Sequence, residues 1–211
     1  MRFPYCSIIA ASLGLSLLSL LSLAQSHKPI NKEGIYLGIS GGTWFPDNKN
    51  KVLGSPPIIG FCSDFKWSKY NFGLSFDLIG WPRGKTREPV KIKKQDSILM
   101  RNEYFGAQIV FNYGRPFWET NRFVFEGIAD IGYGQLTYYN PNQYIHVDKG
   151  SLVFSPGLST RCIILKRHYA QLKAQYCIAN YKLKDNVSTD FRGNYFLTRI
   201  VIGSISNADN N

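Results

Sequence analysis

Four acidic and four basic residues stand singly within segments that otherwise alternate between apolar and small side chains. They are Asp64, Asp77, Glu126 and Asp130, and Lys66, Arg161, Lys173 and Arg199. If these side chains share one narrow interior, they are costly to bury unpaired. We therefore expect a network of ion pairs and hydrogen bonds, which would serve either as a gated polar path or as a polar plug.

A second group with chemical potential contains His146 and Asp148, with Ser151 five residues after the histidine. Hydrogen-bond geometry, and not nearness in sequence, defines a catalytic pair, so this group is a weak indication of catalysis. The sequence contains no glycine-rich phosphate loop, zinc-ligand pattern or nucleophile elbow. We predict no catalytic residue, no cofactor and no metal site.

The cysteines do not indicate a metal site. Cys62, Cys162 and Cys177 do not have the spacing of zinc ligands, and we expect them to act as small apolar side chains. Cys162 and Cys177 lie on neighbouring strands of one predicted hairpin, so a disulfide between them stays open as an alternative.

The segment 82–102 is strongly basic, with a net charge of +5. Its basic residues include Arg83, Lys85, Arg87, Lys91, Lys93 and Lys94. We expect a surface loop that contacts an anionic ligand such as lipopolysaccharide, a polysaccharide or a host polyanion; the alternative is a solvated loop with no ligand. Nucleic acid is not expected, because no basic helical stripe or known binding motif is present.

Eight runs of alternating residues must position these groups. They are approximately Gly34–Trp44, Pro57–Trp67, Tyr70–Gly80, Glu103–Tyr113, Arg122–Tyr138, Ser151–Leu165, His168–Tyr181 and Asn194–Ser204. Alternation of this kind predicts β-strands whose two faces differ. One face is large and apolar, and the other carries glycine, serine and the charged residues above.

Connections between these runs are alternately long and short, which is typical of an up-and-down membrane barrel. The interior of an eight-stranded barrel has no room for the many phenylalanines of the apolar face, whereas glycine and serine fit it. We therefore predict an all-β fold: an eight-stranded antiparallel up-and-down transmembrane β-barrel with its apolar face toward lipid.

Aromatic residues gather near the predicted strand ends, where amphipathic rings favour the membrane interface. We expect two aromatic belts that include Trp44, Trp67, Trp81, Tyr113, Trp118, Tyr138, Tyr169 and Tyr181. The longer connections would then face outward from the cell and the tight turns would face the periplasm.

The first 24 residues have the form of a signal peptide, with Arg2 before an apolar run and small residues before Gln25. An uncleaved anchor is the alternative. The expected organisation is signal peptide 1–24, N-terminal arm 25–33, barrel 34–204 and C-terminal tail 205–211. The formal net charge is +11, and about +10 remains once Arg2 is removed.

Together, the opening segment 34–42 (GIYLGISGG), the inward glycine and serine positions and the rhythm of the connections resemble small OmpA/OmpX-like, porin-family outer-membrane β-barrels of Gram-negative bacteria. The resemblance spans about 34–204 and implies an outer-membrane location, contact with outer-membrane lipid and lipopolysaccharide, and a structural or adhesive role. It does not indicate the oligomeric state. A lipid-A-modifying enzyme, a narrow channel and a secreted lipocalin-like barrel are the alternatives.

Overall fold

The computed structural model describes residues 33–94, 97–120, 122–140, 145–165, 167–181, 191–192 and 194–207. The predicted signal peptide, all but the last residue of the predicted N-terminal arm, and residues 208–211 lie outside this part of the chain. The described ranges therefore cover most of the predicted barrel.

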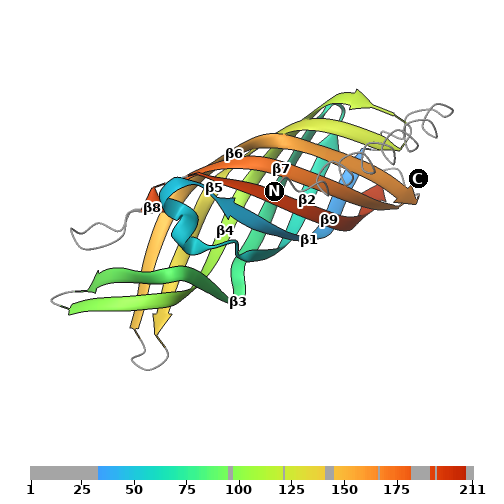
Figure 1. Cartoon of the computed structure of the whole chain (residues 1–211). Coiled ribbons are helices and arrows are strands. Elements are labelled where there is room, and N and C mark those ends of the chain that lie inside the picture. Colours follow the sequence, from blue (N-terminus) through green and yellow to red (C-terminus); the bar gives the residue numbers. More distant parts are fainter. Residues whose placement is uncertain are drawn as a thin grey trace, which may run out of the picture.

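Eight long strands form one closed antiparallel wall, as predicted (Figure 1). The elements are β1 (Gly34–Pro46), η1 (Asn48–Leu53), β2 (Pro57–Trp67), β3 (Tyr70–Lys94), β4 (Ser97–Glu119), β5 (Phe123–Asn140), β6 (Ile145–Leu165), β7 (His168–Tyr181), β8 (Phe191–Arg192) and β9 (Tyr195–Asn207). Each long strand pairs with its neighbour in sequence, and β9 closes the barrel against β1. The two-residue β8 pairs with β7 beside this wall. Because the barrel is closed, no strand edge of the described wall exposes unpaired backbone N–H and C=O groups to the lipid.

The outer surface of the wall is apolar on every strand. Its side chains that are at least half exposed include Ile39, Phe61, Leu74, Ile109, Ile131, Leu158, Leu172 and Ile202, one from each of the eight long strands. A soluble monomer rarely exposes a contiguous apolar belt of this extent. A membrane barrel requires one, because lipid is its outer solvent.

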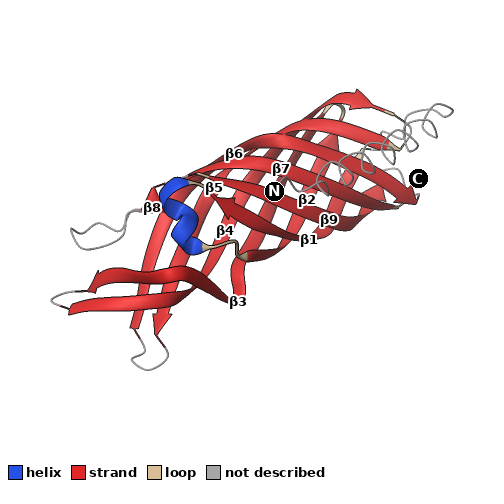
Figure 2. Ribbon diagram, in the orientation of Figure 1, coloured by secondary structure: helices blue, strands red, loops and turns tan. Residues whose placement is uncertain are grey.

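The inner surface takes the residues between these positions. In β2 and β7 the burial of side chains alternates almost perfectly along the strand. Because successive side chains of a strand point to opposite faces, each strand divides into a lipid-facing set and an interior set. Figure 2 shows the wall of strands, with η1 lying at one end of it.

The basic segment 82–102 is not a loop, contrary to the prediction. The β3–β4 hairpin continues through it, from the pair Gly84–Tyr104 to the pair Lys94–Ser97, with one register shift just before Gly84 and another between Lys85 and Val90. About 9–11 residues suffice to cross a membrane as a tilted strand. With 25 and 23 residues, β3 and β4 extend past the barrel, as Figure 1 shows. Charged side chains made this extension look like a loop in the sequence.

Other strands also extend past the ends that the sequence predicts for them. The β5–β6 hairpin extends to the pair Asn140–Ile145, inside the predicted long connection 139–150. At the opposite end, β4 runs to Glu119 and β9 runs to Asn207, into the predicted tail. Backbone pairing therefore continues beyond the sequence range in which apolar alternation is clear.

Half of the predicted aromatic belt is wrong. Trp44, Tyr138, Tyr169 and Tyr181 are buried inside the barrel, with at most 1% of their surface exposed. Each has the same parity along its strand as the interior residues, and parity determines the face that a side chain occupies. Trp67, Trp81 and Trp118 do lie exposed on the outer surface, and Tyr113 is partly exposed there.

None of the helices in the described part of the chain is long and apolar enough to cross a membrane.

Introducing a charge into the apolar belt tests this orientation. We expect Ile109→Arg to lower the free energy of unfolding in lipid vesicles by about 2–4 kcal/mol, because the guanidinium would face hydrocarbon near the middle of β4. The matched control is Met100→Arg, on the exposed extension of the same strand. Urea titration of the vesicle-inserted chain measures both. Equal effects of the two substitutions would contradict an outward apolar face at Ile109.

Candidate functional site

The structure places the eight charged residues of the sequence analysis in the barrel interior. They come from six of the strands, and none of these residues has more than 4% of its surface exposed. The strands hold them there because all have interior parity. Each of them takes part in an ion pair within the described residues, and we call the set the lumen network: Asp64, Lys66, Asp77, Glu126, Asp130, Arg161, Lys173 and Arg199.

Arg199 is the hub of the network toward the long hairpins. Its Nη1 donates to both carboxylate oxygens of Asp77, at 3.2 and 3.1 Å, and its Nη2 lies 3.9 Å from Asp130. Gln108 donates to Asp77 at 2.8 Å, and Gln175 donates to Asp130 at 2.7 Å. Each carboxylate thus has a cation and a neutral amide donor, which offsets the desolvation that burial imposes.

Asp64 links Arg161 with Lys173. Its carboxylate lies 3.9 Å from Lys173 Nζ and 4.0 Å from Arg161 Nη2. Asn112 donates to it at 3.2 Å. A cation on either side keeps this carboxylate compensated at the centre of the lumen.

Glu126 is the most heavily bonded acid. Arg161 lies 3.3 Å from its carboxylate, and Ser159, Gln171 and Asn71 all donate to it. The Arg161 guanidinium also lies over the ring of Tyr36, 4.5 Å from the ring centroid, a cation–π arrangement. Arg161 is therefore held by both charge and ring contacts.

Lys66 pairs with a residue that the sequence analysis missed. Its Nζ lies 3.5 Å from Glu119, at the tight-turn end. Glu119 lies beyond the predicted fourth strand, Glu103–Tyr113, so the alternation of that strand does not predict which face it occupies. With Glu119 included, every basic residue of the network has an acidic partner within 4.0 Å.

Little space remains between these groups. A cavity of about 10 Å³ lies among Asp64, Glu126, Asp130, Arg161 and Lys173. Such a volume accommodates about one water molecule. The interior thus resembles a filled core more than a path for solutes.

Apolar clusters cover the charged layer at both ends. Toward the long hairpins, the cluster includes Trp44, Leu53, Tyr104, Tyr138 and Tyr195. There Trp44 stacks on Tyr195 at 4.0 Å between centroids, and Tyr104 donates to the Leu53 carbonyl of η1 at 2.8 Å. Toward the tight turns, a smaller cluster includes Tyr36, Cys62, Ile163 and Tyr169.

Glycine makes room for one of these rings. A Cβ atom at Gly38 would lie 2.7 Å from the Tyr169 hydroxyl oxygen, and one at Gly203 would lie 2.7 Å from the Tyr169 ring. A real Cβ is not found so close to such atoms. Tyr169 therefore occupies the lumen only because β1 and β9 have glycine opposite it.

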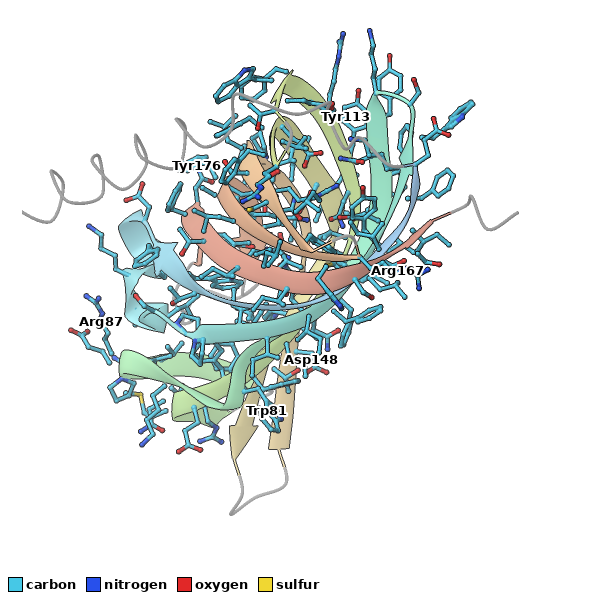
Figure 3. All side chains as sticks on the ribbon, turned by 90° about the vertical axis from the view of Figure 1, so that its right-hand side faces the viewer. Trp81, Arg87, Tyr113, Asp148, Arg167 and Tyr176 are labelled. Atoms are coloured by element: carbon cyan, nitrogen blue, oxygen red, sulfur yellow. The ribbon has the colours of Figure 1, made fainter. Side chains whose placement is uncertain are left out.

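Three of the six basic residues predicted to form an anion-binding surface have side chains in the described part of the chain. Lys85, Arg87 and Lys91 are exposed on the β3 extension, and Figure 3 shows Arg87 at the periphery. Alternating with them, Gly84, Thr86 and Val90 are buried, and Val90 belongs to the aromatic cluster under η1. The side chains of Arg83, Lys93 and Lys94 lie outside the described part.

Residues of the weak catalytic group do not come together where they are described. Asp148 is exposed and accepts a hydrogen bond from Thr137 at 2.7 Å, whereas Ser151 is buried and its Oγ accepts one from the Asn180 amide at 2.7 Å. Asp148 and Ser151 thus lie on opposite faces of β6. The side chain of His146 lies outside the described part.

Cys62, Cys162 and Cys177 are free thiols, so the alternative of a Cys162–Cys177 disulfide is not realised. Among the described residues, no group of histidine, cysteine and carboxylate side chains has the arrangement of a metal site.

Removing one acid tests the lumen network. We expect Asp77→Ala to lower the free energy of unfolding by about 3–5 kcal/mol, because Arg199 would stay buried without its closest carboxylate. Asp148→Ala, which removes an exposed carboxylate, is the matched control and should change it by less than about 0.5 kcal/mol. Urea unfolding in detergent micelles measures both. A wild-type midpoint for Asp77→Ala would contradict the pairing.

Comparison with known proteins gives a likeness of structure alone. No family model matches the chain, and no curated protein matches it in sequence. The crystal structure of Neisserial surface protein A is similar, with a TM-score of 0.56 and 8% identity over 84% of this chain and 99% of that one.

Two further solved structures align with lower scores. Ail of Yersinia pestis, in complex with the heparin analogue sucrose octasulfate, has a TM-score of 0.49 and 14% identity over 83% of this chain and 98% of that one. The N-terminal β-barrel domain of Pseudomonas aeruginosa OprF has a TM-score of 0.44 and 7% identity, over 83% of this chain and 100% of that one. With its closed wall and apolar exterior, the chain has the fold of the small eight-stranded outer-membrane β-barrels.

Proposed function

We propose that the mature chain is an integral outer-membrane β-barrel with a closed lumen, which acts through its basic hairpin on anionic partners at the cell surface. The observation that carries the proposal is the exposed row of Lys85, Arg87 and Lys91 on a paired strand extension. A basic surface of this kind attracts polyanions by charge, in a manner that salt weakens.

The extension is anchored to the barrel, which favours binding. Val90 packs in the cluster that also contains Leu53 of η1, and Tyr104 of the opposing strand bonds to η1. A binding surface held in place loses less conformational entropy when a ligand arrives than a flexible loop does. The hairpin also carries the acidic residues Glu88 and Glu103, so its surface has both charges, with the basic residues in excess.

In this proposal, lipopolysaccharide is the anionic partner that lies nearest to the hairpin. Its phosphate groups would lie beside the outer end of the barrel, and arginine and lysine both bind phosphate through charge-assisted hydrogen bonds. Host or bacterial polysaccharides with sulfate or carboxylate groups have the same chemistry. The role is then structural or adhesive.

The alternatives fit the geometry less well. A lipocalin-like protein needs an apolar cavity for its ligand, and this interior is ionic and nearly filled. The same packing, with apolar clusters above and below the charges, supports a closed lumen over a narrow channel. For a lipid-A-modifying enzyme, the separation of Asp148 from Ser151 removes part of the expected group.

Neutralising the hairpin tests the proposed function. We expect the triple variant Lys85→Gln/Arg87→Gln/Lys91→Gln to bind dextran sulfate and lipopolysaccharide about 3-fold to 150-fold more weakly, since each exposed ion pair contributes about 0.2–1 kcal/mol. The protein is the full mature chain in lipid nanodiscs, and titration at low and high salt measures the affinity. Wild-type binding should weaken with salt.

Against the pair Lys85→Gln/Arg87→Gln, the matched control is Arg122→Gln/Arg167→Gln, which removes two exposed cations from the opposite end. It should retain most of the affinity. An equal loss in both variants would assign binding to net charge and contradict a role for the hairpin.

A further inference from the structure

An open hollow lies on the outer wall at the tight-turn end, far from the basic hairpin. Its volume is about 680 Å³, and it is lined by Lys69, Gly127 and residues 115–119. Volumes of this size are typical of sites that take small ligands. Neither the lumen network nor the proposed surface function uses it.

The hollow exists because, at this end of the barrel, β4 continues past the point where its neighbour β3 begins. The strand β3 begins at Tyr70, and its pairing with β4 ends at Asn71–Gly114. Beyond Gly114, β4 pairs only with β5, and the register shifts between Pro116 and Trp118. A bulge of this kind bends a strand and redirects its side chains.

Two cations border the hollow. Lys69, from the β2–β3 turn, and Arg115 are both exposed, and neither has an ion-pair partner in the described part of the chain. The acid of the hollow, Glu119, has its carboxylate 3.5 Å from the buried Lys66. The hollow therefore has an excess of positive charge.

Its floor and one wall are apolar and open. A Cβ atom at Gly127 would meet nothing within 4 Å. Gly127 is paired with Arg115, and the neighbouring ring of Trp118 stacks on Phe125, with 4.7 Å between centroids. An aromatic wall beside a cationic rim suits an amphiphile better than a simple ion.

The hollow opens onto the lipid-facing surface. Next to it, rings of Tyr70, Tyr113, Phe72 and Phe111 follow one another along the outer wall, 5.6–6.3 Å apart. Figure 3, which looks onto this end, shows Tyr113 on the outside of the barrel. A molecule with its anionic group at Lys69 and Arg115 would have its apolar chains against these rings.

We infer that this hollow binds the phosphate headgroup of an anionic phospholipid, in the leaflet on the side of the tight turns. Arg115 and Lys69 hold the phosphate oxygens, Trp118 covers the glycerol region, and the acyl chains run along the aromatic row. The inference rests on the proposed membrane location, but on none of the residues of the basic hairpin.

Fluorescence quenching by brominated lipids tests the site. The protein is the full mature chain with Trp67→Phe and Trp81→Phe, so that Trp118 is the exposed tryptophan and Trp44 stays buried in the opposite end. Vesicles contain brominated phosphatidylglycerol or brominated phosphatidylcholine at equal mole fraction. We expect Trp118 to prefer phosphatidylglycerol by about tenfold, the equivalent of about 1.4 kcal/mol.

Two paired variants separate the hollow from the general charge of this end. Lys69→Gln/Arg115→Gln should reduce the preference to about one, whereas Arg122→Gln/Arg167→Gln, two exposed cations outside the lining of the hollow, should retain most of it. Heat-modifiable gel mobility confirms that each variant is folded. An equal loss in both pairs would overturn the assignment.

Further outcomes distinguish the lipid site from the membrane location itself. With Lys69 and Arg115 intact, equal quenching by both lipids would overturn the lipid site alone, while no quenching by either lipid would overturn the membrane location too. Inorganic phosphate added to phosphatidylcholine vesicles should leave Trp118 fluorescence unchanged. A change that depended on Lys69 and Arg115 would make this a site for a soluble anion and overturn the lipid assignment.

Discussion

Placing the large apolar side chains on the outside is the constraint on which the rest of this structure depends. Side chains on each strand alternate between two environments, and only one of those environments can be hydrocarbon. Once Ile39, Ile109 and Ile202 face lipid, the alternate positions must fill a narrow interior. Glycine, serine and compensated charges meet that demand, and closure of β9 on β1 satisfies the backbone.

The interior then has its own energetic problem. Eight charged side chains are almost fully removed from water, so each needs partners to offset its desolvation. Asp77 and Glu126 obtain them from a guanidinium and from neutral amides, and Lys66 obtains one from Glu119. Apolar clusters at both ends keep bulk water from this layer. A network so constrained suits a rigid scaffold that presents functional groups at its two ends.

Much of this could be predicted from the sequence, since alternation alone assigns a face. The antiparallel order of the eight strands and the interior parity of Asp64, Arg161 and Lys173 follow from it. The aromatic prediction is wrong where nearness to a strand end conflicts with parity. Trp44 has the parity of Tyr36 and Ser40, and Tyr181 has that of Lys173 and Gln175, so the signal was present.

Other features depend on pairing that no local pattern encodes. The β3–β4 extension has charged and bulged segments, and it is stabilised by contact of Val90 with the η1 region. The hollow at Lys69 and Arg115 requires an overhang of one strand beyond another and a bulge at Phe117, both of which are properties of register.

Nitroxide labels placed one at a time at positions 107–112 of β4, in the vesicle-inserted chain, test the outward orientation of the apolar face most directly. We predict that collision with oxygen dissolved in lipid alternates with a period of two, high at Ala107, Ile109 and Phe111 and low at Gln108, Val110 and Asn112. The opposite phase, or uniform accessibility along the strand, would contradict that orientation.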